Sequence, residues 1–172
     1  MRPPAGPLRQ IKFARPARAY GVYMFKHIAI PTDGSKLADK GVRAGVKLAQ
    51  CLGARVTGVY VVPPWRPAVY GEIAVYYVPG MSPADYKRQS LKAAKKALAA
   101  VEIEAKSAGV TYETRIVTAE RPHAGILRAA RAAKCDAIAM ASHGRGAVGG
   151  LLLGSETARV LSQSKLPVLV TR

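Results

Sequence analysis

The feature that most limits the folds open to this chain is a strict alternation of short apolar segments with longer segments of helical periodicity. The apolar segments are residues 27–33, 54–62, 112–118, 137–141 and 167–171. Between them, apolar residues recur every three or four positions in Leu37–Leu52, Pro83–Ala108, a run that opens at Pro122, and Ser155–Gln163. This alternation predicts an α/β domain with a parallel sheet, and right-handed crossovers place helices on both of its faces.

Local signals mark where the predicted elements begin and end. Gly53 and Gly109 follow the first two helical patterns, as expected of glycines that terminate a helix. Ser82 stands directly before Pro83, with Asp85 in the first turn, which is typical of a helix start. The segment 54–62 is apolar on both of its faces, which indicates a strand covered by helices on each side.

Two stretches lie outside this alternation. Residues 1–25 contain four prolines and, together with Lys26, six basic residues and no acid. We expect them to form a disordered basic extension before a folded domain at 26–172, with Met24 as an alternative start of the natural chain. The connection 63–83 carries Trp65 and several tyrosines, which we expect to cover the sheet end or a partner subunit, and its residues 72–78 also fit a short strand.

Length, hydropathy and cysteine content exclude several classes of protein. A chain of 172 residues suits one domain with a real core. No apolar run reaches the roughly 18 residues needed to cross a bilayer, and no secretory signal is evident, so we expect a cytoplasmic protein without a membrane segment. Cys51 and Cys135 give neither a disulfide framework nor a CxxC metal pair, which favours a reducing compartment and an inert, buried Cys135.

The charge balance is strongly basic. The 27 Lys and Arg residues exceed the 10 Asp and Glu residues, for a formal net charge of +17. Because the basic residues are dispersed, a solvated basic surface is favoured over a specific nucleic-acid site. Non-specific, salt-sensitive attraction to nucleic acids would follow from the charge alone.

A sheet of this class binds ligands at the carboxyl ends of its strands, where the direction of winding reverses. Two loops are expected to meet there. One is the turn Pro31–Thr32–Asp33 after the first strand, and the other is the loop after residues 137–141, which holds five glycines from Gly144 to Gly154.

The glycine-rich loop ends at Gly154 and Ser155, where the last helix is predicted to begin. The first amides of a helix lack partners and carry partial positive charge, and a glycine lets an anion come close to them. The Ser155 hydroxyl would cap the helix or add a hydrogen bond to the anion. Phosphate binding is one interpretation, and a mobile loop with an ordinary serine cap is the other.

A second pattern in the same loop does not support dinucleotide binding. The letters GRGAVG at Gly144–Gly149 match a dinucleotide fingerprint. That motif belongs after the first strand, with an acid about 20 residues later, and neither condition is met.

Several motifs in order make the sequence resemble the universal stress protein family. Nucleotide-binding members carry G-x2-G-x9-G-[S/T] after the fourth strand, and the matching positions here are Ala141, Gly144, Gly154 and Ser155. IPTDGS at 30–35, VYVV at 59–62, SHGRG at 142–146 and KLPVLVTR at 165–172 agree as well. The resemblance covers His27–Arg172 and implies a single doubly wound α/β domain with a five-stranded parallel sheet in the order 3-2-1-4-5.

The resemblance also implies a site for ATP, alone or with Mg²⁺. Asp33 would lie under the adenosine, Val61 would line the adenine pocket, and the start of the last helix would hold the phosphates. The residues of this expected site are Pro31, Thr32, Asp33, Val61, Met140, Ala141, Gly144, Arg145, Gly154, Ser155, Glu156 and Thr157. Metal ligands are left unassigned.

Two positions depart from the family pattern. Ala141 replaces the first motif glycine, and its methyl group is expected to crowd the ligand, although alanine is the smallest available change. Glu156 places an acid beside the expected phosphates, which requires Mg²⁺ or Arg145 to offset it.

What the resemblance implies about function is a nucleotide-dependent regulator or sensor in stress response. The final strand is expected to pair with its copy in a homodimer, near Val168 and Val170. Any ATP hydrolysis is expected to be slow, because no general base or arginine clamp is evident from the spacing. A dimeric member that does not bind nucleotide, and a basic nucleic-acid-associated protein, stay as alternatives.

Overall fold

The computed structural model describes residues 25–66, 81–142 and 153–172, and these contain five strands and four helices. The strands are β1 His27–Pro31, β2 Arg55–Val62, β3 Tyr112–Thr118, β4 Ala137–Ala141 and β5 Val168–Thr171. The helices are α1 Lys36–Leu52, α2 Pro83–Ser107, α3 Pro122–Ala132 and α4 Ser155–Gln163. Every element of the predicted alternation is present. Residues 1–24 of the expected N-terminal extension 1–25, and the possible strand at 72–78, lie outside the described residues.

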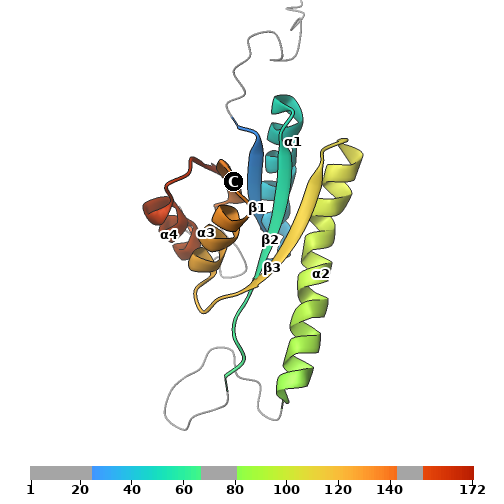
Figure 1. Cartoon of the computed structure of the whole chain (residues 1–172), viewed down its shortest axis with the longest axis vertical. Helices are drawn as coiled ribbons and strands as arrows, with labels where there is room; N and C mark the ends of the chain where they lie inside the picture. The colour runs from blue at the N-terminus through green and yellow to red at the C-terminus, as the bar shows by residue number, and fades with distance from the viewer. Residues whose placement is uncertain (1–24, 67–80, 143–152) are drawn as a thin grey trace, which may run out of the picture.

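All five strands run parallel in one sheet, in the order β3-β2-β1-β4-β5. Helices α1 and α2 lie on one side of this sheet, and α3 and α4 lie on the other (Figure 1). The predicted α/β class and strand order are confirmed. The chain winds from β1 outward to β3, then returns to β4 beside β1, so the winding reverses between these two central strands.

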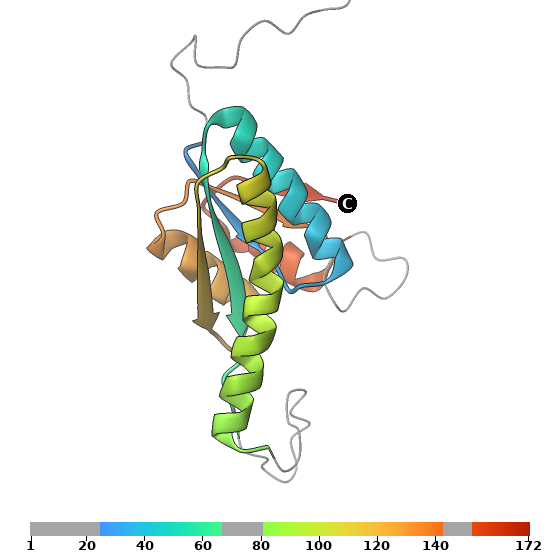
Figure 2. The same cartoon turned by 90° about the vertical axis from the view of Figure 1, so that its right-hand side faces the viewer.

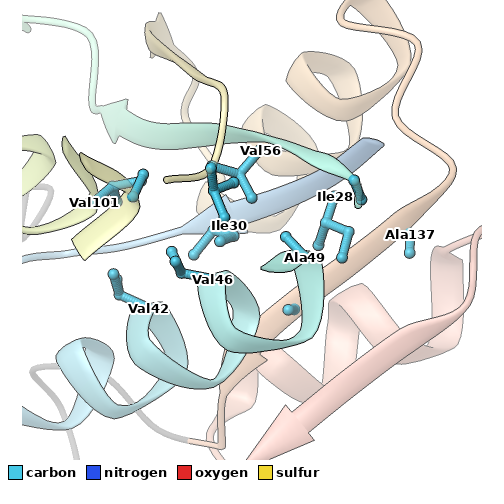
Figure 3. Packing of buried hydrophobic residues seen from close by; sticks show 12 residues of the cluster. Ile28, Ile30, Val42, Val46, Ala49, Val56, Val101 and Ala137 are labelled. Carbon is cyan, nitrogen blue, oxygen red and sulfur yellow. The ribbon is translucent and has the colours of Figure 1, made fainter. Parts of the chain in front are cut away.

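The face under α1 and α2 encloses one of the two apolar clusters. Ile28 and Ile30 of β1 share this cluster with Val42 and Val46 of α1 and with Val101 of α2 (Figure 3). None of these side chains is more than 1% exposed. Because burying one aliphatic side chain contributes about 1.5–3 kcal/mol, this cluster fixes both helices on the sheet.

The opposite face holds the second cluster, under α3 and α4. Ile138 and Met140 of β4 pack there with Ile126 of α3 and Val160 of α4. Successive side chains of a strand point to opposite faces, and Ala139 accordingly belongs to the cluster under α1. Strand β4 is therefore covered on both sides, as a central parallel strand should be.

The longest helix extends past the sheet. The first turns of α2 continue beyond the carboxyl ends of the strands, and its buried residues begin only at Ala94 (Figures 1 and 2). Ser82 caps the helix by accepting the Asp85 N–H at 3.1 Å. The Tyr86 hydroxyl donates to the Pro63 carbonyl at 2.8 Å, which ties this part of α2 to the segment after β2.

A polar chain of side chains lies at the opposite, amino edge of the sheet. His27 is 3% exposed, and its Nε2 lies 2.6 Å from the Thr57 hydroxyl. That hydroxyl donates to Glu113 at 3.0 Å, so the imidazole must donate to Thr57. Burial lowers the pKa of His27, and the positive charge of Arg55 lowers it further. This histidine is therefore held neutral and structural.

The two cysteines differ in environment. Cys51 is exposed and Cys135 is buried, and both are free thiols. Burial raises the pKa of Cys135 to about 11. The interpretation of Cys135 as an inert thiol is therefore supported.

Among the described helices, none combines the length and the apolar character that crossing a bilayer would require.

Candidate functional site

The carboxyl ends of β1 and β4 adjoin at the point where the sheet reverses its winding. Ala29 pairs with Ile138 between these two strands, so Pro31 and Ala141 end at the same edge of the sheet. Loops that follow such neighbouring strands form the ligand-binding crevice of doubly wound sheets. The structure therefore places the strand ends from which the two predicted loops leave at one edge of the sheet.

The turn after β1 is organised by its own side chains. The Thr32 hydroxyl accepts the Gly34 N–H at 3.1 Å, and Asp33 Oδ1 accepts the Ser35 N–H at 2.9 Å. Ser35 then caps α1 by accepting the Ala38 N–H at 3.1 Å. Gly34 has φ of 75°, a conformation that favours glycine. Asp33 thus tightens the turn with one carboxylate oxygen, at the edge where the adenosine is expected.

The end of β4 is joined directly to the start of α4. The Gly154 N–H donates to the Ser142 carbonyl at 2.8 Å. The buried Thr157 hydroxyl donates to the Ala141 carbonyl at 3.1 Å. These two bonds hold the first turn of α4 against the sheet edge. The predicted site residues Gly144 and Arg145, which lie between these elements in sequence, fall outside the described residues.

Helix α4 begins with uncapped amides. Gly154 is the N-cap residue, and among the described residues no side chain caps the amides of the first turn. The first main-chain bond of the helix runs from the Ala158 N–H to the Gly154 carbonyl. The N–H groups of Ser155, Glu156 and Thr157 therefore have no partner in the part of the chain that the structure describes. Such amides carry partial positive charge and suit an anion.

The role predicted for the Ser155 side chain needs a correction. We expected its hydroxyl to cap the helix or to bind the anion, but Gly154 occupies the cap position and Ser155 is the first helical residue. A capping side chain belongs to the N-cap residue, which has an extended backbone and directly precedes the first helical residue. Gly154 has that backbone, with φ −66° and ψ 147°, but no side chain. Binding of the anion by the exposed Ser155 hydroxyl stays a prediction.

The Glu156 side chain is turned to α3. Its Oε2 accepts the His123 N–H at 2.8 Å and lies 2.8 Å from His123 Nδ1, while its Oε1 pairs with Arg159. Burial alone would raise the pKa of Glu156, but the hydrogen bonds from His123 and Arg159 outweigh it and hold that pKa below its usual range. The acid is therefore charged and neutralised locally, and its backbone N–H stays at the start of α4.

Ala141 has its methyl group on the α1 side of the sheet, because side chains alternate along β4 and Ala139 also faces α1. The residue is 6% exposed. Gly41 of α1 lies against its backbone. The departure from the family glycine is thus absorbed by the core beneath α1.

Val61 and Met140 face the opposite side, toward α3 and α4. Both pack in or against the cluster under these helices. A β-carbon on Gly125 of α3 would lie 2.7 Å from a Val61 methyl, so the glycine lets α3 approach this valine closely. Met140 is 7% exposed and contributes mainly to the core, whereas Val61 is only half-buried.

Two residues of this region were not identified from the sequence. His123 lies 33 positions before its partner Glu156, and no motif links the two. Gly41 appears in the sequence only as one of two glycines on a helical face. Neither has a local signal, because each acts through a contact between elements that are distant in the sequence.

In the part of the chain that the structure describes, acidic, histidine and cysteine side chains do not gather around a metal position. Over the described ranges, which exclude residues 143–152, no group of three or more of these residues could hold an ion. Glu156 is already engaged by His123 and Arg159.

The chain matches one known protein family over most of its length. The model of the "Universal stress protein family" matches residues 24–172. A Thermus aquaticus protein named "Universal stress protein in QAH/OAS sulfhydrylase 3'region" is 33% identical over 150 residues, which are 87% of this chain and all of that protein.

Solved structures also resemble this chain over most of its length. The hypothetical protein MJ0577, solved in a structural-genomics test case, is 26% identical, with a TM-score of 0.66 over 86% of this chain and 96% of its own. A universal stress protein in complex with cAMP is 25% identical, with a TM-score of 0.61 over 86% of this chain and 97% of its own.

Proposed function

The chain belongs to the universal stress protein family, and from this premise we propose that it binds an adenine nucleotide, ATP foremost, at the carboxyl edge of its sheet. Binding there would make it a nucleotide-dependent regulatory or sensor module in stress response. Its two free thiols are compatible with the cytoplasm, where we place it.

The observation that carries this proposal is the start of α4. The three amides of Ser155, Glu156 and Thr157 have no partner in the described residues and lie beside the end of β4. A helix start of this kind favours phosphate oxygens through both hydrogen bonds and its dipole. The universal stress protein solved with cAMP supports the choice of an adenine nucleotide.

The remaining roles follow from position. In our proposal Asp33, with Pro31 and Thr32, lies under the adenosine, and Val61 borders the adenine, with Met140 below it. Gly154 leaves room for a phosphate, which the amides of α4 and the Ser155 hydroxyl bind. Gly144 and Arg145 are proposed as further phosphate ligands, although they fall outside the described residues.

Both departures from the family pattern are compatible with binding. By the alternation of side chains along β4, the Ala141 methyl faces α1 as Ala139 does, and the Glu156 carboxylate is bound by His123 and Arg159. Any Mg²⁺ that accompanies the ATP would take most of its ligands from the phosphates and water, as is usual for Mg²⁺ at nucleotide sites.

Calorimetric titration of ATP tests this function. Gly154→Val should abolish binding, because the valine would occupy the phosphate position, and the extended backbone of Gly154 accepts a β-branched residue without strain. Ser155→Ala is the milder companion and should weaken binding only several-fold, because it removes one hydrogen bond. A wild-type protein without affinity for ATP, AMP or cAMP would leave the non-binding alternative in its place.

We also propose that the protein is a homodimer through β5, the edge strand beside β4. Val168 and Val170 pack against the cluster under α3 and α4, and Leu169 on the other face is 41% exposed. Pairing of two β5 strands would cover this edge and Leu169. Light scattering should show a dimer that Leu169→Lys weakens, and a monomer at tens of micromolar would contradict the proposal.

A second candidate function, non-specific binding of duplex nucleic acid, is favoured by a basic surface on α1 and α2. Both helices lie on the same face of the sheet (Figure 2). The exposed cations of this surface are Lys36, Lys40, Arg43, Lys47, Lys92, Lys95 and Lys96. None of them takes part in an ion pair within the described residues. Like charges three or four residues apart destabilise a helix, and a polyanion would relieve that repulsion.

Fluorescence anisotropy with a labelled DNA duplex tests this second function. The triple variant K40Q/R43Q/K47Q should lower the salt dependence of log K by roughly 0.9 for each phosphate that is left without its cation. The matched control R121Q/R131Q/K165Q removes three exposed charges on or near the α3 side and should change affinity little. Equal reductions of affinity in both variants would show an effect of net charge without a defined surface.

A further inference from the structure

The pair His123–Glu156 joins the starts of two helices. His123 is the second residue of α3, and Glu156 is the second residue of α4. Helix α3 has no side-chain cap of its own, because its N-cap residue is Arg121. The Glu156 carboxylate supplies that cap from the neighbouring helix by accepting the His123 N–H.

The carboxylate is bound on both oxygens. One oxygen, Oε2, accepts the His123 backbone N–H and lies 2.8 Å from Nδ1 of the same residue, and the other pairs with Arg159. His123 is 2% exposed, whereas the Glu156 side chain is 30% exposed. Because the lowered pKa of Glu156 keeps it ionised, Nδ1 of His123 must carry the proton that it donates.

A glutamate at position 156 would interfere with phosphate binding at the start of α4 if its carboxylate were not held by His123. Negative charge of any kind is stabilised by the first turn of a helix, so a free Glu156 carboxylate and a phosphate would compete for the same amides of α4. A carboxylate within several ångströms of a phosphate would also repel it, since the interaction of like charges is strong near a protein surface. Binding by His123 and Arg159 instead directs the carboxylate to α3 and spreads its charge over an imidazole, a guanidinium and an amide.

We propose that His123 is a positioning residue of the nucleotide site. Together with Arg159 it keeps the Glu156 carboxylate off the start of α4, and so it sets how much phosphate charge the site accepts. This inference rests on the proposed binding of an adenine nucleotide and adds a determinant of ligand charge to it.

The proposal predicts a loss of affinity that depends on phosphate charge. In His123→Ala, one partner of the carboxylate is removed and Glu156 is freed toward α4. Affinity should fall about tenfold for ATP, less for AMP, and by no more than about twofold for adenosine, because only the phosphates meet the carboxylate. In the double variant H123A/E156Q the charge is gone, and the ratio of ATP affinity to adenosine affinity should return to that of the wild type.

Calorimetric titration separates this role from general destabilisation. ATP, AMP and adenosine are each titrated into the wild type, His123→Ala, H123A/E156Q and a control, His27→Asn. His27 is also a buried histidine with a hydrogen-bonded imidazole, but it lies at the amino edge of the sheet. Its replacement should leave the ratio of ATP to adenosine affinity unchanged, even if thermal stability drops.

Three outcomes are decisive. A charge-dependent loss of affinity in His123→Ala that H123A/E156Q reverses supports the inference. An equal loss for all three ligands contradicts it and makes His123 a purely structural residue. A wild type that binds none of the three contradicts the proposed function, and the inference with it.

Discussion

Gly41, in the first half of helix α1, lies directly against the backbone of Ala141 at the end of β4. A β-carbon placed on Gly41 would stand 2.6 Å from the Ala141 nitrogen and 3.0 Å from the Met140 carbonyl carbon. Backbone atoms of a central strand cannot move aside as the end of a long side chain can. This close approach therefore sets how tightly α1 covers the edge of the sheet at which the nucleotide is expected.

Replacement of Gly41 by alanine should destabilise the fold and disturb the site together. The helix gains up to about 1 kcal/mol from the better propensity of alanine, but overpacking against backbone costs about 1–3 kcal/mol, so we expect a net destabilisation. Gly45→Ala is a milder comparison on the same helix face: the shortest distance is 2.8 Å to the terminal methyl of Ile30, which can rotate away, and the Ala139 β-carbon at 3.0 Å needs only a small shift. Urea denaturation would contradict this account if Gly41→Ala were the more stable of the two.

Restoring the family glycine at Ala141 should matter little for nucleotide binding. Since the Ala141 methyl is buried on the α1 side, Ala141→Gly should keep the ATP affinity within about threefold, with a stability loss of about 0.5–1 kcal/mol from the more flexible strand. Calorimetry measures the ATP affinity, and thermal denaturation measures the stability of the fold. A gain in affinity much above tenfold would show that the methyl does face the ligand.

Acid should weaken the fold through His27. Its pKa is lowered from the ordinary 6.5, so below pH 6.5 the unfolded chain takes up a proton that the folded protein binds less readily. Stability is therefore complete above pH 6.5 and declines as the pH falls through the folded pKa. Comparison of wild type with His27→Gln by urea denaturation from pH 8 to 5 should show their difference shrinking with acid, and a constant difference would refute the assignment.

Glu113 and Glu156 act in a lower pH range. The pKa of Glu113 lies below the ordinary 4.5 mainly through hydrogen bonds from Arg115 and Thr57. The pKa of Glu156 lies below 4.5 through hydrogen bonds from His123 and Arg159. Stability from these carboxylates is present above pH 4.5 and is lost as they are protonated at lower pH. Glu113→Gln should flatten the decline in stability below pH 4.5, and an unchanged slope would remove Glu113 from this account.

The two thiols should differ strongly in reactivity. A disulfide reagent at pH 8 is expected to label the exposed Cys51 rapidly, and Cys135 only after denaturation, because its pKa is raised to about 11 by burial. Cys51→Ser should therefore leave almost no fast reaction. Fast labelling in that variant would show that the region around Cys135 opens readily.

The sequence predicts this fold well because its signals are local. The cap at Ser82, the glycine at Gly53 and the apolar spacing of each helix specify the element bounds, and the alternation of elements determines the parallel sheet. Ser155 shows the limit of such signals, because serine is a common cap residue and yet the preceding glycine takes that position.

The site was predictable only in part. The ends of β1 and β4, from which the two loops leave, lie together because neighbouring parallel strands end at one edge, which the topology requires. The direction of the Glu156 carboxylate depends on His123 in another helix, and the tolerance for Ala141 depends on Gly41. Such contacts arise from packing between distant segments, which periodicity and spacing do not report.

The most direct test of the central claim is an amide chemical-shift titration of ¹⁵N-labelled protein with ATP and with adenosine. We expect ATP to shift the N–H resonances of Ser155, Glu156 and Thr157 strongly, as new hydrogen bonds to phosphate form, and adenosine barely to move them. ATP binding that leaves these three amides unchanged would contradict the claim that the start of α4 holds the phosphates.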